Sequence, residues 1–126
     1  MFTNNNRFNK GGVALYIQNN IPAILKREQT FIRNGIETIF ADLNTPIIII
    51  AVGLMYKRSV DNSTENFSIA LEETISSPDP NIKTFIMGDF NINLIDYSTS
   101  PPVENVLNLI ISRNFYPVIT NQLYFN

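Results

Sequence analysis

The sequence contains no cysteine and no histidine. Without cysteine, disulfide frameworks, thiol catalysis and cysteine-based zinc sites are excluded. Without histidine, this chain supplies no imidazole base and no Ser-His-Asp triad. Charged residues make up only 16% and the formal net charge is −2, so bulk positive charge does not draw nucleic acid to the chain. Any contact with phosphate must therefore come from a local site.

Long apolar stretches are also scarce. The longest, Ile47–Met55, is broken only by Gly53; it is too short to span a bilayer and predicts a buried strand. The polar residues 1–10 are not followed by an apolar segment with a cleavage site. We therefore expect an intracellular protein, nuclear or cytoplasmic, that is neither secreted nor held in a membrane. Residues 1–126, 44% hydrophobic, suffice for a single domain with a core.

The hydrophobic periodicity predicts more strand than helix in the first half of the chain. Strands are expected at 13–17, 36–43 and 47–56, with a short extended piece within 24–32. Asn44-Thr45-Pro46 predicts a tight turn. The strands on either side of this turn should therefore form an antiparallel hairpin, and the second strand, apolar on both faces, should be central in its sheet.

The second half of the chain predicts two amphipathic helices. One covers 63–77, and the other begins at Pro101 with Ser100 as its cap. A short buried strand is expected at 83–87, and Val118-Ile119-Thr120 can start another. The apolar stripe of the second helix consists of Val103, Val106, Leu107, Ile110 and Ile111. The fold class predicted is α/β (α+β), with a mixed or mainly antiparallel sheet covered by two helices.

One polar constellation follows the last predicted strand. Asp89, Asn91 and Asn93 stand at alternate positions, so they can share one side of the chain while Phe90 and Ile92 point into the core. A carboxylate at the mouth of a sheet can orient a water or help to hold a cation, and the two amides can donate to phosphate or DNA. The ordinary alternative is an Asx-rich turn, in which these side chains only satisfy nearby backbone groups.

Gly88-Asp89-Phe90-Asn91 resembles the central motif of the endonuclease/exonuclease/phosphatase superfamily, the DNase I-like enzymes. From about Arg7 to Thr120, the chain resembles the endonuclease domain of non-LTR retrotransposons. The segments that carry the resemblance occur in the family's order and lie at 7–17, 36–40, 49–58, 88–94 and 115–120. The resemblance implies part of a layered DNase I-like α/β sandwich. It also implies a parent enzyme that uses Mg²⁺ to nick DNA and leaves a 3′ hydroxyl to prime reverse transcription.

The resemblance further implies roles for individual residues. Asp89 matches the aspartate that orients and deprotonates the attacking water, and Asn91 matches the asparagine that holds the scissile phosphate. Tyr56 matches a tyrosine that contacts the same phosphate. Lys57 and Arg58 keep positive charge beside the DNA backbone, although the prolines usual in that loop are absent. Considered without the family, these two residues are a solvated loop pair.

Several parts of the family's site are missing from this sequence. The family takes an asparagine and a Mg²⁺-binding glutamate from an upstream strand and a Ser-Asp-His segment from downstream, and this sequence begins after the first and ends before the second. Glu37 lies on the wrong strand to replace the glutamate and is expected to be an exposed strand residue. Asp89 alone can hardly both hold Mg²⁺ and act on water. We therefore expect no tight metal site, no enzyme-like hydrolysis by this chain alone, and self-association through unpaired strand edges.

Three hypotheses remain open. The chain is part of a retrotransposon-type endonuclease domain, or a non-catalytic interaction module derived from that fold, or an unrelated α+β domain with a chance Gly-Asp-Phe-Asn. A closed fold in which Asp89 is buried and paired would favour the third.

Overall fold

The structure is a computed structural model that describes residues 2–4, 12–58, 64–75 and 79–118. The chain separates into two compact units. The first consists of residues 1–63 and 77–91, and the second of residues 64–76 and 92–126. None of the helices in the described ranges is long and apolar enough to cross a membrane.

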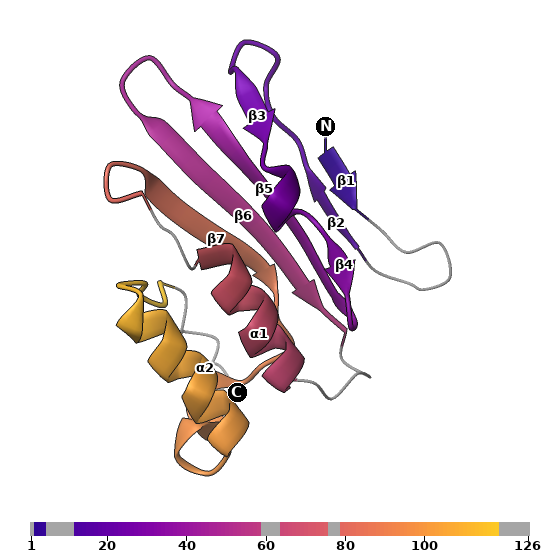
Figure 1. The fold of residues 1–126 in the computed structure, drawn as a ribbon, viewed down its shortest axis with the longest axis vertical. Helices are drawn as coiled ribbons and strands as arrows, with labels where there is room; N and C mark the ends of the chain where they lie inside the picture. The colour runs from indigo at the N-terminus through magenta and orange to yellow at the C-terminus, as the bar shows by residue number, and fades with distance from the viewer. Residues whose placement is uncertain (1, 5–11, 59–63, 76–78, 119–126) are drawn as a thin grey trace, which may run out of the picture. The chain divides into compact units, whose positions relative to one another are not determined.

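The first unit is built on a mixed five-stranded sheet (Figure 1). Its strands are β3 (Ala23–Leu25), β4 (Ile32–Arg33), β5 (Ile36–Asn44), β6 (Ile49–Lys57) and β7 (Lys83–Asp89). β3 and β4 both pair with β5, β5 and β6 form an antiparallel hairpin, and β6 pairs with β7 in parallel. The predicted hairpin and the internal position of β6 are thus confirmed. Two further strands, β1 (Phe2–Asn4) and β2 (Val13–Leu15), form a separate antiparallel pair.

The core of this unit follows β5, which is buried on both faces over residues 36–41. Phe40, only 2% exposed, lies opposite Gly53 of β6. A Cβ at Gly53 would collide with the Phe40 ring. The glycine that interrupts the apolar run of β6 therefore gives the aromatic ring its space.

Two sequence-based predictions about this sheet are wrong. β7 is not a buried strand: Phe85 is 51% exposed and Met87 50% exposed. Phe85 and Met87 alternate with the half-buried Thr84 and Ile86, so one face of β7 is less covered than the other; β7 also pairs only with β6 among the described strands. Glu37 was expected to be exposed but is buried, with an exposed fraction of only 2%. It lies in the stretch of β5 that is covered on both faces.

The extended piece expected within 24–32 is only partly extended. It begins in β3, turns through the short 3₁₀ helix η1 (Arg27–Gln29) and ends at the start of β4. Thr30 stabilises this turn, because its Oγ1 donates to Lys26 O at 2.9 Å and accepts from Phe40 N at 3.1 Å. The interruption lets β3 and β4 pair with different parts of β5.

The second unit contains the helices α1 (Thr64–Ile75) and α2 (Pro101–Ser112), with the 3₁₀ helix η2 (Leu94–Ser98) before α2. Both predicted helices are confirmed, and with the mixed sheet they establish the α+β class. Ser100 stands at the N-cap of α2 as expected, although its side chain makes no capping bond. The apolar stripe of α2 is narrower than predicted, because Val103 and Val106 are buried whereas Ile111 is 51% exposed.

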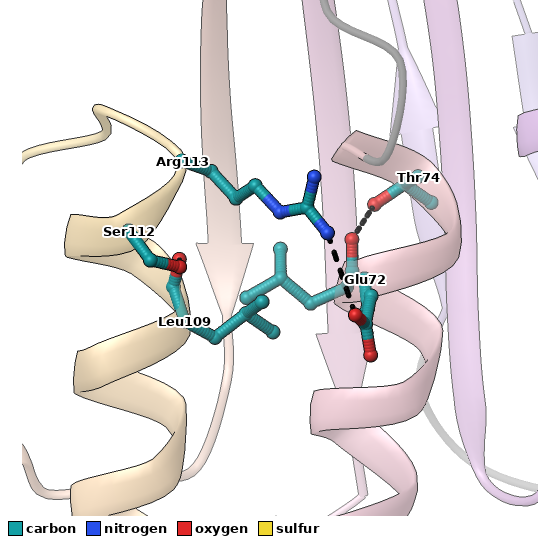
Figure 2. Close-up of polar contacts among 6 residues, drawn as sticks. Glu72, Thr74, Leu109, Ser112 and Arg113 are labelled. Carbon is teal, nitrogen blue, oxygen red and sulfur yellow. Dashed lines mark hydrogen bonds and ion pairs between the residues drawn. The ribbon is translucent and has the colours of Figure 1, made fainter.

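Polar contacts join α1 to the end of α2 within this unit (Figure 2). Arg113 Nη2 donates to Glu72 Oε1 at 3.4 Å and so links the two helices, whereas Thr74 Oγ1 donates to Leu71 O at 2.8 Å within α1. Asn114 ends α2 in the left-handed conformation, with φ of 61°, as a C-terminal asparagine can. Val118 is not in a strand, and residues 119–120 of the strand expected there lie outside the described residues.

Candidate functional site at the carboxyl ends of β6 and β7

The parallel pairing of β6 with β7 brings the carboxyl ends of both strands to the same edge of the sheet. In this register Tyr56 lies opposite Asp89, and on its other side Tyr56 lies opposite Glu37 of β5. Glu37, Tyr56 and Asp89 therefore form one row. The row crosses β5, β6 and β7, which are neighbours in the sheet (Figure 1). Tyr56 and Asp89, more than thirty residues apart in the sequence, are therefore neighbours at the position where the sequence motifs predict a site.

Gly88 allows the two strands to approach closely just before Asp89. It has a φ of 144°, a conformation that residues with a side chain rarely adopt. A Cβ at this position would collide with the carbonyl oxygen of Met55 on β6. The glycine of the Gly-Asp-Phe-Asn motif is therefore required by the backbone, and it fixes where the following carboxylate emerges.

The loop after β7 is held by the two polar residues of the motif. Asp89 Oδ1 accepts a hydrogen bond from the backbone N–H of Asn91 at 3.2 Å, which closes an Asx turn. Asn91 is left-handed, with φ of 47°, and its Nδ2 donates to Lys57 O at 2.6 Å. This bond ties the loop to the end of β6. Both side chains belong to exposed residues, whereas Phe90 is half-buried, as the alternation predicts.

Asn93 has a different function in the local structure. It precedes η2, and its Oδ1 accepts from the backbone N–H of Ile95 at 3.2 Å. It also belongs to the second unit, whereas Asp89 and Asn91 belong to the first. The structure therefore shows Asn93 as the cap of a short helix.

Lys57 and Arg58 are not a solvated loop pair. Lys57 is 3% exposed and is the last residue of β6, where pairing with Ile36 keeps it in the ladder. Its Nζ donates to Arg58 O at 3.3 Å. Arg58 is half-buried, and its backbone N–H donates to Gly35 O at 3.2 Å. Burial of the lysine leaves Arg58 as the more accessible cation of the two.

Arg33 is a further cation at this end of the sheet, and the sequence analysis missed it. Arg33 pairs with Ile36, which in turn pairs with Lys57, so these three residues form the neighbouring row. Its guanidinium lies 4.3 Å from the centroid of the Phe31 ring. The signal was the Asn34-Gly35 pair, a favoured two-residue hairpin turn, whose φ values are 52° and 77°.

Carboxylates that could hold Mg²⁺ are few at this strand end. The row offers one exposed carboxylate, Asp89, and one buried carboxylate, Glu37. In the part of the chain that the structure describes, no three His, Cys, Asp or Glu residues lie together as a metal site. Mg²⁺ requires near-octahedral oxygen coordination. We therefore assign no step at this site to a metal ion.

Comparison with known proteins assigns no family. No protein-family model, no curated protein and no solved structure matches this chain. The likeness to retrotransposon endonucleases rests on the sequence motifs alone.

Proposed function

We propose that this chain is the central part of a Mg²⁺-dependent DNA endonuclease domain of retrotransposon type. We further propose that the chain by itself binds the DNA backbone at the carboxyl ends of β6 and β7 without cleaving it. The observation that supports this best is the register of Tyr56 with Asp89, together with the bond from Asn91 Nδ2 to Lys57 O. These contacts join the motif residues from two distant segments.

The chemistry of this strand end suits a phosphodiester. The Asx turn fixes the carboxylate of Asp89 through Oδ1, so Oδ2 is available to orient a water molecule. Asn91 Nδ2 carries two hydrogens; one goes to Lys57 O, and the other can donate to a phosphate oxygen. Tyr56 lies beside Asp89 in the ladder and can contact the same phosphate. Arg58 and Arg33 add positive charge on the β5 side of this edge.

Hydrolysis requires more than these groups. A phosphodiester accumulates charge on the phosphoryl and leaving oxygens, and a metal ion is the usual stabiliser of that charge. In the row described above, Asp89 is the one exposed carboxylate and would have both to hold such an ion and to act on water, and the sequence has no histidine to act in its place. Binding without enzyme-like cleavage is the behaviour we expect of the chain alone.

A non-catalytic interaction module is the second candidate, and one observation favours it. Each of the three polar side chains at 89, 91 and 93 makes a backbone hydrogen bond: Asp89 Oδ1 accepts from Asn91 N, Asn91 Nδ2 donates to Lys57 O, and Asn93 Oδ1 accepts from Ile95 N. In that case these residues would serve the fold only. The unrelated α+β domain is less favoured, because Asp89 is exposed rather than buried.

Backbone amide NMR during titration with a short DNA duplex and Mg²⁺ separates these candidates. We expect the amides of Tyr56, Arg58, Asp89 and Asn91 to shift together, and the effect to weaken as salt rises. The matched control is Asn81, which closes an Asx turn with Asp79 at the other end of β7. The amide signal of Asn81 should not shift.

Plasmid nicking in the presence of Mg²⁺ tests the catalytic part of the proposal. We expect no enzyme-like conversion of supercoiled to nicked plasmid. Robust nicking that Asp89→Ala abolishes would show that the chain is an active nuclease. A duplex that leaves the amides around Asp89 unchanged would reject DNA binding and leave the interaction module.

A further inference from the structure

β7 presents a long strand edge with little protection. Its seven residues pair only with β6 among the described strands. The opposite side of the sheet is different, because there β5 is flanked by β3 and β4, of three and two residues. Short edge strands, prolines and interior charges normally prevent association of sheet edges. β7 has no proline, and its charges, Lys83 and Asp89, stand only at its two ends.

The exposed side chains of β7 are apolar between those charges. Phe85 is 51% exposed and Met87 is 50% exposed, whereas Thr84 and Ile86 are half-buried. Two large neighbouring apolar side chains on a strand with one open edge form a surface that association can cover. The open edge and the exposed apolar pair therefore occur on the same strand.

We propose that β7 pairs with β7 of a second copy of this chain, antiparallel, about a two-fold axis at Ile86. In this register Lys83 of each copy lies opposite Asp89 of the other. Phe85 lies opposite Met87 of the second copy, a favourable pairing of aromatic and thioether side chains. A two-fold interface requires a surface that is complementary to itself. The sequence of β7 meets this condition, because opposite charges stand at equal distances from its centre.

Charge complementarity selects this register and this occupant. Seven residues overlap completely only when the pairing is centred on Ile86, and this register places both charges opposite a partner. A shift by two residues would place Lys83 opposite Met87 and leave Asp89 beyond the ladder. An antiparallel ladder alternates hydrogen-bonded and non-hydrogen-bonded pairs, so it can form whether or not Ile86 bonds across the axis. The pairing would join the two sheets into one.

Sedimentation equilibrium of charge-reversal variants tests the register. The single variants Lys83→Asp and Asp89→Lys each place like charges opposite each other at both symmetric positions. We expect each to weaken dimerisation by about tenfold. The double variant, Lys83→Asp with Asp89→Lys, restores opposite charges and should return the dissociation constant to within about threefold of the original. Arg27→Asp and Asp79→Lys make the same charge changes at exposed positions outside β7 and should have no effect.

Cross-linking provides an independent test that does not depend on the charge variants folding. The chain has no cysteine, so a single introduced thiol is unambiguous. In the proposed register, the two copies of residue 86 have Cα atoms about 4.5–5.5 Å apart, within disulfide range. Ile86→Cys should therefore form a covalent dimer under mild oxidation. Thr84→Cys is the control, because its two copies are displaced by four residues, about 13 Å along the strands.

Three results would overturn the proposal. The first is an unaltered chain that stays monomeric at every concentration reached. The second is a double charge variant that associates no better than the single variants. The third is equal cross-linking of Ile86→Cys and Thr84→Cys. If another part of the same chain covers the edge of β7, we expect the unaltered chain to stay monomeric and Ile86→Cys and Thr84→Cys to cross-link equally.

Discussion

The two ends of β7 carry the same local motif and differ in what surrounds it. Before the strand, Asn81 N donates to Asp79 Oδ1 at 2.8 Å; after it, Asn91 N donates to Asp89 Oδ1 at 3.2 Å. Both are Asp-x-Asn turns with exposed side chains. Only the second turn is linked to a neighbouring strand, through the bond from Asn91 Nδ2 to Lys57 O.

This comparison shows that spacing alone does not make a site. Asp-x-Asn predicts an Asx turn at both ends of β7, and the structure contains one at each. The candidate site arises only at the carboxyl end, because there the parallel register adds Tyr56 and the preceding glycine brings the backbone of β6 close. The expected differences between the two turns can be measured.

Gly88→Ala should produce the largest difference, since the turn before β7 does not depend on such a glycine. The new Cβ would collide with Met55 O, and a φ of 144° is strained for alanine. We expect a loss of about 3 kcal/mol in the free energy of unfolding, measured with urea. Asn81→Ala, the control at the other end, should cost only about 0.5 kcal/mol. A similar small loss for Gly88→Ala would mean that β7 does not approach β6 as the structure has it.

Asn91→Ala should have the next largest effect. The variant loses the bond to Lys57 O and the tolerance of asparagine for a φ of 47°. We expect the free energy of unfolding to fall by about 1.5 kcal/mol, against about 0.5 kcal/mol for Asn81→Ala. Asn91→Gly separates the two causes, because glycine keeps the left-handed backbone and removes only the amide. If Asn91→Gly is as stable as the original chain, the side-chain bond contributes nothing.

The sequence predicts those parts of the fold that local pattern determines. The hairpin of β5 and β6 follows from two apolar strands around Asn44-Thr45-Pro46, and both helices follow from their 3.6-residue periodicity. Asp89 and Asn91 are exposed and Phe90 is half-buried, as predicted, although these residues form an Asx turn rather than a continued strand. In these regions each residue's environment is set by its near neighbours in sequence.

The errors concern burial that depends on which faces of the sheet are covered and on how many strands flank a residue. Lys83–Met87 is apolar enough for a buried strand. Among the described strands, however, β7 pairs only with β6, and no local sequence pattern indicates this. Glu37 and Lys57 are polar and were expected to be exposed, yet both lie in well-covered parts of the β5–β6 ladder. Arg33 was missed for a different reason, because the Asn34-Gly35 turn signal that places it was present and not used.

Asp89→Asn should produce the smallest difference and the one most specific to function. Asparagine keeps the side-chain oxygen that accepts from Asn91 N, so the free energy of unfolding should change by less than about 0.5 kcal/mol. Because a carboxylate repels a nearby phosphate, its removal should strengthen binding to a DNA duplex by about threefold, measured by fluorescence anisotropy at low salt. Asp79→Asn makes the same change in the matching turn and should leave the affinity unaltered. If the two variants raise the affinity for DNA equally, binding depends on the net charge of the chain and not on a site at the carboxyl ends of β6 and β7.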